Sequence, residues 1–117
     1  MNYNIAVLNG PNLNLLGTRE PETYGHDTLA TIEKLCHQTA ESCGAKIDFF
    51  QTNHEGDLID RIQACRGKVD AIVLNAAAWP HTSVAIRDAV TAARLPFYAV
   101  HITNVPKPYE TGRAACW

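Results

Sequence analysis

Short apolar runs recur at four places along the chain and predict four β-strands. Each run is continuous in apolar character and bounded by polar, glycine or proline positions, as in strands buried on both faces of a parallel sheet. The predicted strands cover residues 4–9, 46–52, 69–75 and 96–102.

Between these runs, apolar residues recur every three or four positions, which is the period of an amphipathic helix. The predicted helices cover residues 29–43, 55–66 and 82–94. Asp27 or Thr28 offers an N-cap for the first helix. Gly44 and Gly67 follow the first two helices, where a left-handed glycine commonly ends a helix.

Strands and helices therefore alternate, and this order calls for a parallel sheet with right-handed crossovers and helices on both faces. A chain of 117 residues has room for one core, so we expect a single domain over residues 1–117. An α/β, flavodoxin-like, doubly wound sheet with strand order 2-1-3-4 fits best. Ligands of such sheets bind beyond the carboxyl ends of the strands where the order reverses, here between strands 4–9 and 69–75.

A long loop over residues 9–25 follows the first strand. Five of its residues interrupt helix and strand, namely Gly10, Pro11, Gly17, Pro21 and Gly25. Four others carry polar groups, namely Asn12, Asn14, Arg19 and Tyr24. Loops this long within a compact domain are usually functional. Leu13, Leu15 and Leu16 alternate with the polar groups and suggest a packed loop; the alternative is a surface loop that faces water.

Composition narrows the class of protein. The chain is 46% hydrophobic and 19% charged, which is typical of a globular domain. Its net charge of -2 gives no electrostatic footprint for nucleic acid or for an anionic membrane. No apolar run approaches a membrane span, and the N-terminus lacks a signal-peptide pattern. We expect a cytoplasmic protein with neither nucleic acid nor membrane as a partner.

Several kinds of site find no support in the spacing of reactive residues. The cysteines lack a CxxC pair and are expected to be buried or half-buried free thiols, namely Cys36, Cys43, Cys65 and Cys116. No metal is expected, because recurring ligand spacing is absent from His54, Glu55, His81 and His101. Gly10 and Gly17 belong to no phosphate-binding motif, and Ser83 lies on no nucleophile elbow.

A set of proton-transfer and hydrogen-bonding residues remains in the segments that follow or end the predicted strands 4–9, 69–75 and 96–102. They are Asn12, Arg19, Tyr24, Asn75, His81 and His101. Tyrosine, with a reference pKa of about 10, is a poor base near neutrality unless its phenolate is stabilised. Arg19 could stabilise it, and histidine suits the acid role. Taken singly, Tyr24 could be a lid aromatic, His81 a helix-start residue and His101 a core residue.

Four segments resemble the type II dehydroquinases, also called 3-dehydroquinate dehydratases. They are Leu8 to Pro21 followed by Tyr24-Gly25, then Phe50 to Gly56, His81 to Ala89 and Val100 to Val105. The match is collinear from about residue 4 to 105. The resemblance implies a flavodoxin-like fold and a cofactor-free dehydration of 3-dehydroquinate to 3-dehydroshikimate through an enolate. It also implies a homo-oligomer, a trimer or a dodecamer.

The resemblance further implies catalytic roles for four residues. Tyr24 would be the base that removes the proton next to the ketone, with Arg19 lowering its pKa. Asn12 would position a water on the developing enolate oxygen. His101 would help to protonate the departing hydroxyl.

Substrate-binding roles are implied in the same way. Asn75 and His81 would bind substrate hydroxyls. The backbone N–H groups of Ile102 and Thr103 would hold the carboxylate, with Thr103 in place of the usual serine. Asp88 would reach the site of a neighbouring subunit.

The sequence also departs from the family pattern. Ala77, two residues after Asn75, replaces the glycine of the family pattern. Ala99 replaces the usual glutamate before Val100 and His101. Beyond Val105 the agreement ends, and Arg113 lies one position from the place of the substrate-binding arginine. The usual fifth strand and last helix have no counterpart.

Three interpretations follow from the matches and the departures. The first is a dehydroquinase or a shortened relative. The second is a catalytically impaired or inactive homologue that keeps the fold and ligand binding. The third is a flavodoxin-like interaction domain that pairs through strand 96–102, which would be an open edge.

Overall fold

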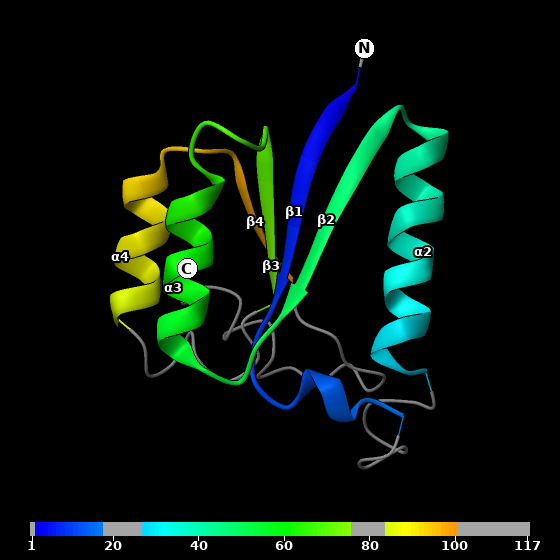
Figure 1. Cartoon of the computed structure of the whole chain (residues 1–117), viewed down its shortest axis with the longest axis horizontal. Helices are drawn as coiled ribbons and strands as arrows, with labels where there is room; N and C mark the ends of the chain where they lie inside the picture. Colours follow the sequence, from blue (N-terminus) through cyan, green and yellow to red (C-terminus); the bar gives the residue numbers. More distant parts are fainter. Residues whose placement is uncertain (1, 18–26, 76–83, 101–117) are drawn as a thin grey trace, which may run out of the picture.

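The computed structural model describes residues 2–17, 27–75 and 84–100. Within these ranges β-strands and α-helices alternate as the sequence predicts, with a short 3-10 helix (η1) after the first strand (Figure 1). The elements are β1 (Tyr3–Asn9), η1 (Leu13–Leu15), α2 (Leu29–Ser42), β2 (Ala45–Gln51), α3 (Glu55–Cys65), β3 (Ala71–Asn75), α4 (Val84–Ala93) and β4 (Phe97–Ala99).

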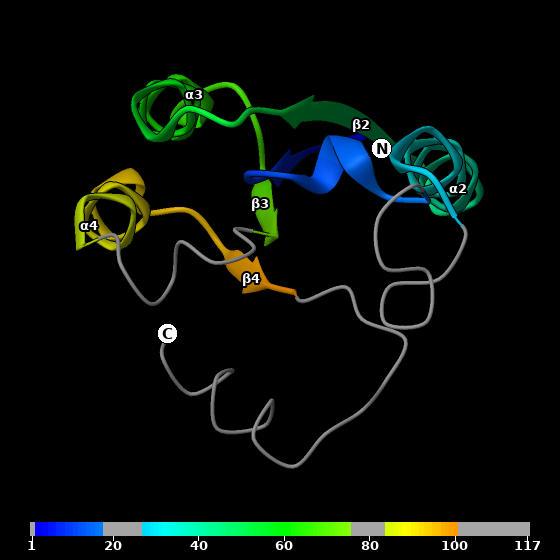
Figure 2. The same cartoon turned by 90° about the horizontal axis from the view of Figure 1, so that it is seen from below.

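The four strands form one parallel sheet in the order β2-β1-β3-β4. This confirms the predicted order 2-1-3-4. Helices α3 and α4 lie together on one face of the sheet, and α2 lies on the other (Figure 2). The right-handed crossovers explain this arrangement, because the chain turns one way from β1 to β2 and the other way from β2 to β3 and β4.

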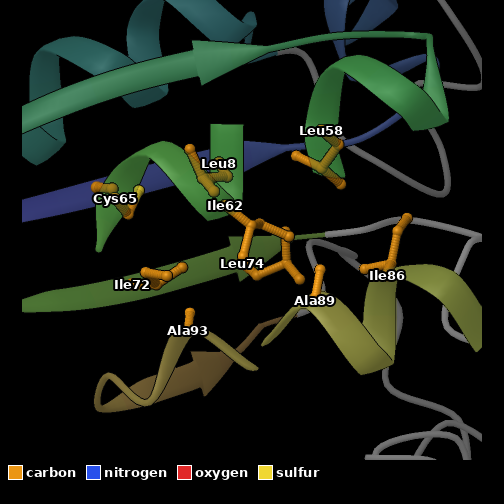
Figure 3. Close-up of a cluster of buried hydrophobic side chains, with 10 residues drawn as sticks. Leu8, Leu58, Ile62, Cys65, Ile72, Leu74, Ile86, Ala89 and Ala93 are labelled. Atoms are coloured by element: carbon orange, nitrogen blue, oxygen red, sulfur yellow. The ribbon is translucent and has the colours of Figure 1, made fainter. Parts of the chain in front are cut away.

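The hydrophobic core lies between the sheet and the α3–α4 pair (Figure 3). Ala6 and Leu8 alternate with Val7 along β1, so both point to this face, where Leu8 is fully buried. The cluster consists of Ala6, Leu8, Leu58, Ile62, Cys65, Ile72, Leu74, Ile86, Ala89 and Ala93. The helical members recur at three- and four-residue spacing, as the periodicity predicts.

The helix ends follow local capping chemistry. Thr28, rather than Asp27, caps α2, because its hydroxyl oxygen accepts a hydrogen bond from the Thr31 N–H at 3.2 Å. Gly44 and Gly67 have φ angles of 76° and 79°, as expected of residues that end helices. Residues 82–83 of the third predicted helix lie outside the described residues.

Two strand boundaries differ from the prediction. β3 begins at Ala71 rather than residue 69, because the Val69 N–H donates to the Cys65 carbonyl at 3.1 Å and so belongs to the turn that ends α3. β4 covers only Phe97–Ala99 of the predicted 96–102, and residues 101–102 lie outside the described residues. Tyr98 and Val100, on this outer strand and just after it, are 61% and 46% exposed.

The cysteines partly match the expectation of buried or half-buried thiols. Cys65 is buried and Cys36 is half-buried, but Cys43, which directly follows the last residue of α2, is exposed. All three are free thiols, and Cys116 lies outside the described residues. None of the described helices has both the length and the apolar character needed to cross a membrane.

Candidate active site at the carboxyl edge of the sheet

Three side-chain amides form a row at the carboxyl ends of β2, β1 and β3. Asn9 pairs in register with Gln51 of β2 on one side and with Asn75 of β3 on the other. Asn9 and Asn75 are only 2% and 3% exposed. The row lies at the point where the strand order reverses, which is where parallel sheets of this type bind ligands.

The loop after β1 is anchored to both neighbouring strands. The Gly10 N–H donates to the Asn75 carbonyl at 2.7 Å, and the Gln51 side-chain amide donates to the Gly10 carbonyl at 3.1 Å. Leu13 and Leu16 are 8% and 6% exposed, so this part of the loop is packed. The expectation of a packed loop is confirmed for these two leucines, whereas Leu15 is 43% exposed.

Asn12 has a left-handed backbone conformation in this loop. Its φ and ψ are 67° and -2°, and its N–H donates to Asn53 Oδ1 at 2.9 Å. Its carbonyl accepts the Leu15 N–H at 3.0 Å, which opens η1. The Asn12 side chain does not cap η1, and the residue is exposed at the edge of the sheet. This position suits an amide that meets a ligand.

The structure brings Asn12 and Asn75 to the same edge, connected through Gly10. Asp88 is elsewhere, exposed on α4 and outside the stripe of Ile86, Ala89 and Ala93 that faces the core. The other predicted site residues lie outside the described residues; these are Arg19, Tyr24, His81, His101, Ile102 and Thr103.

Sequence reasoning missed the contribution of Gln51 and Asn53 to this edge. Both contact the loop after β1, and Asn53 accepts hydrogen bonds from Asn12 and from Gln51. The available signal was their place in the segment Phe50 to Gly56, at and just after the end of a predicted strand.

The side-chain amides described at this edge carry no charge. Amides donate and accept hydrogen bonds without titrating near neutrality, so they can hold hydroxyls, a water or an enolate oxygen. They cannot serve as the acid or the base. Across residues 2–17, 27–75 and 84–100, no three His, Cys, Asp or Glu side chains gather as metal ligands would.

Comparisons with known proteins agree with this arrangement. The family described as Dehydroquinase class II matches residues 3–115. The chain is 60% identical over 103 residues to 3-dehydroquinate dehydratase 2 of Pseudomonas putida. The aligned residues make up 88% of this chain and 69% of that protein. It is 58% identical over 105 residues to catabolic 3-dehydroquinase 1 of Neosartorya fischeri, covering 90% of this chain and 70% of the relative.

A solved structure shows the same fold. The type II dehydroquinase from Butyrivibrio crossotus superposes with a TM-score of 0.87 at 37% identity, covering 97% of this chain and 79% of that one. The family match extends over nearly the whole chain, and the sheet order is the one predicted from the alternation of strands and helices. The chain therefore belongs to the class II dehydroquinases.

Proposed function

We propose that this protein is a hydro-lyase that converts 3-dehydroquinate to 3-dehydroshikimate without a cofactor. The family match over residues 3–115 carries the proposal. Relatives at 60% and 58% identity are named for 3-dehydroquinate. The neutral amides at the carboxyl edge of the sheet suit a polyhydroxylated ligand, since each amide can both donate and accept hydrogen bonds.

In the proposed reaction, the Tyr24 phenolate removes the proton next to the ketone. The electron pair of the broken C–H bond moves onto the carbonyl oxygen and forms an enolate. Asn12 holds a water against this oxygen as its charge develops, and Arg19 keeps the phenolate stable between turnovers. The enolate then collapses and expels the hydroxyl, which His101 helps to protonate, so that one water leaves and an enone remains.

Substrate binding in this proposal uses both side chains and backbone. Asn75 and His81 bind hydroxyls, and the N–H groups of Ile102 and Thr103 hold the carboxylate. Asp88, exposed on α4, reaches the site of a neighbouring subunit. The active form is accordingly a homo-oligomer, a trimer or a dodecamer, and we place it in the cytoplasm.

The test is to follow enone absorbance after 3-dehydroquinate is added to the full chain, beside a sedimentation measurement of its mass. We expect turnover, and we expect Tyr24→Phe to lower kcat by about 10²- to 10⁴-fold with little change in KM, because a general base is lost. Tyr98→Phe is the matched control, because Tyr98 is exposed on β4, and it should keep full activity.

Two results would count against this proposal. Retention of most activity by Tyr24→Phe would show that the base is another group. Absence of turnover in the unmodified chain would overturn the dehydratase function, and calorimetry with 3-dehydroquinate would then show whether the chain is a binding homologue.

A further inference from the structure

The turn after β2 contacts the loop after β1 through two side-chain amides. Asn53 Oδ1 accepts the Asn12 N–H at 2.9 Å and one Gln51 Nε2–H at 3.1 Å. The same Gln51 nitrogen donates to the Gly10 carbonyl at 3.1 Å. Gln51 and Asn53 therefore bind the backbone on both sides of Pro11.

Only one orientation of the two amides satisfies these contacts. The Asn12 backbone N–H can only donate, so Asn53 must present its oxygen to it. Gln51 must then present its NH₂ group, since both the Asn53 oxygen and the Gly10 carbonyl only accept. An amide NH₂ has two hydrogens, and these two acceptors use both; Asn14 Oδ1, at 3.5 Å from the same nitrogen, is at the limit of a hydrogen bond.

The turn that carries Asn53 is itself held in place by Thr52. Thr52 is 7% exposed, and its N–H donates to the Asn9 carbonyl at 3.0 Å. Its hydroxyl oxygen accepts the His54 N–H at 3.0 Å and lies 3.5 Å from Asp57 Oδ2. Asn53 is therefore attached to a turn that is bonded to both β1 and the start of α3.

Asn12 needs such support because its backbone is in an unfavourable region. A φ of 67° is left-handed, which L-residues adopt reluctantly even though asparagine tolerates it better than most. Strained conformations of this kind persist where the surroundings over-determine them. Pro11 has no N–H to contribute, so the flanking groups of Gly10 and Asn12 must hold the segment.

We propose that Gln51 and Asn53 are positioning residues that hold Asn12 in the orientation in which its amide orders a water on the enolate oxygen. The inference rests on the proposed function of Asn12. Neither Gln51 nor Asn53 touches the substrate in this proposal, because both act on the backbone of the loop after β1. Their loss should impair the chemical step more than substrate binding.

The first measurement is steady-state kinetics on the full chain. We expect Asn53→Ala to lower kcat roughly ten- to a hundredfold, as displaced catalytic groups do, with KM within about threefold. Asn53→Asp keeps an oxygen for both donors and should restore most of kcat. Gln51→Glu has the same shape but presents oxygen to two acceptors, so it should lower kcat as Asn53→Ala does. Gln63→Glu, exposed on α3, is the matched control.

A double-mutant cycle separates positioning from a general effect on the fold. If Asn53 acts through Asn12, adding Asn53→Ala to Asn12→Ala causes no further loss of kcat. Losses that multiply instead would overturn the inference. Hydrogen exchange at the backbone N–H of Asn12 tests the contact without an activity measurement. This N–H should be protected in the unmodified chain and should exchange faster in Asn53→Ala. An unprotected backbone N–H in the unmodified chain would overturn the inference.

The failures of the two proposals can be distinguished. Turnover that Asn53→Ala leaves unchanged contradicts only the positioning role. Absence of turnover in the unmodified chain contradicts the dehydratase function, and with it the positioning role of Gln51 and Asn53 in that reaction.

Discussion

At the scale of single residues, three cysteines have different surroundings and should differ in reactivity. Cys65 is 3% exposed in the core, where burial and the nearby Asp48 carboxylate raise the pKa of its thiol, partly opposed by Arg61. Burial and Glu33 raise the pKa of the half-buried Cys36. Cys43 is exposed after α2. The thiolate is the reactive form, so a raised pKa and burial act in the same direction.

Among these three cysteines, we expect iodoacetamide at mildly alkaline pH to modify Cys43 first and Cys65 last, with Cys65 slower by roughly tenfold or more. Peptide mass spectrometry of the timed reaction measures the order, and the same reaction in urea is the control, because unfolding removes the differences. Equal rates at Cys43 and Cys65 in the folded protein would contradict the burial of Cys65.

The raised pKa of Cys65 also sets the sign of a pH effect. The unfolded chain loses this proton first, so the stability that the neutral thiol contributes is complete below about pH 9 and is lost as the pH rises toward the higher pKa of the folded state. Urea unfolding of the unmodified chain and of Cys65→Ala across this pH range tests this effect. The free energy of unfolding should fall less with rising pH in the variant than in the unmodified chain.

At the scale of elements, two of the described α-helices end with a glycine at positive φ and a third ends with another residue. Gly44 follows the last residues of α2, and Gly67 those of α3, both at positive φ, where a side chain is unfavourable. After α4 the residue with a positive φ is Arg94, at 55°. The end of α4 therefore carries a strained residue, whereas the ends of α2 and α3 carry glycine.

Arg94→Gly should raise the free energy of unfolding by about 0.5–1 kcal/mol, because relief of the strain exceeds the entropy that glycine adds to the unfolded chain. Gly67→Ala is the converse test and should lower it by about 1 kcal/mol. No atom lies within 4 Å of a Cβ built on Gly67, so that loss measures backbone strain alone. Urea titration measures the free energy of unfolding of both variants. If neither substitution changes it, the left-handed conformation of Gly67 and Arg94 would be contradicted.

At the scale of the whole molecule, the site depends on the sheet that carries it. Its described residues come from the ends of β1, β2 and β3, which the packing of α3 and α4 holds together through the core. A ligand at this edge binds only the folded chain, so binding and global unfolding are linked.

The Tyr24→Phe variant, with its lowered kcat, allows this linkage to be measured while little substrate is consumed. At a 3-dehydroquinate concentration tenfold above its Kd, we expect about 1.4 kcal/mol of added stability. For a domain of this size, that is a rise in Tm of about 5 °C. Thermal unfolding followed by circular dichroism tests it, with gluconate at the same concentration as the control. An unchanged Tm would argue against a substrate site in the chain.

Much of the fold could be predicted from the sequence, because apolar period and capping chemistry are local properties. The apolar run 4–9 and the helical pattern that Gly44 ends both match the structure closely. The prediction failed at Val69, whose N–H completes a helical turn rather than joining the sheet. This boundary is set by a local backbone hydrogen bond to Cys65, which the period of apolar residues does not report.

The sequence by itself determined the order of the elements, the placement of Asn12 and Asn75 after or at strand ends, and the family resemblance. Only the tertiary structure decided which groups meet. Gln51 and Asn53 bond to Gly10 and Asn12 from 41 residues away, because β1 and β2 run parallel in a single register. The same packing holds Asn12 in a left-handed conformation, since a local pattern shows that a loop exists but not the hydrogen bonds that shape it.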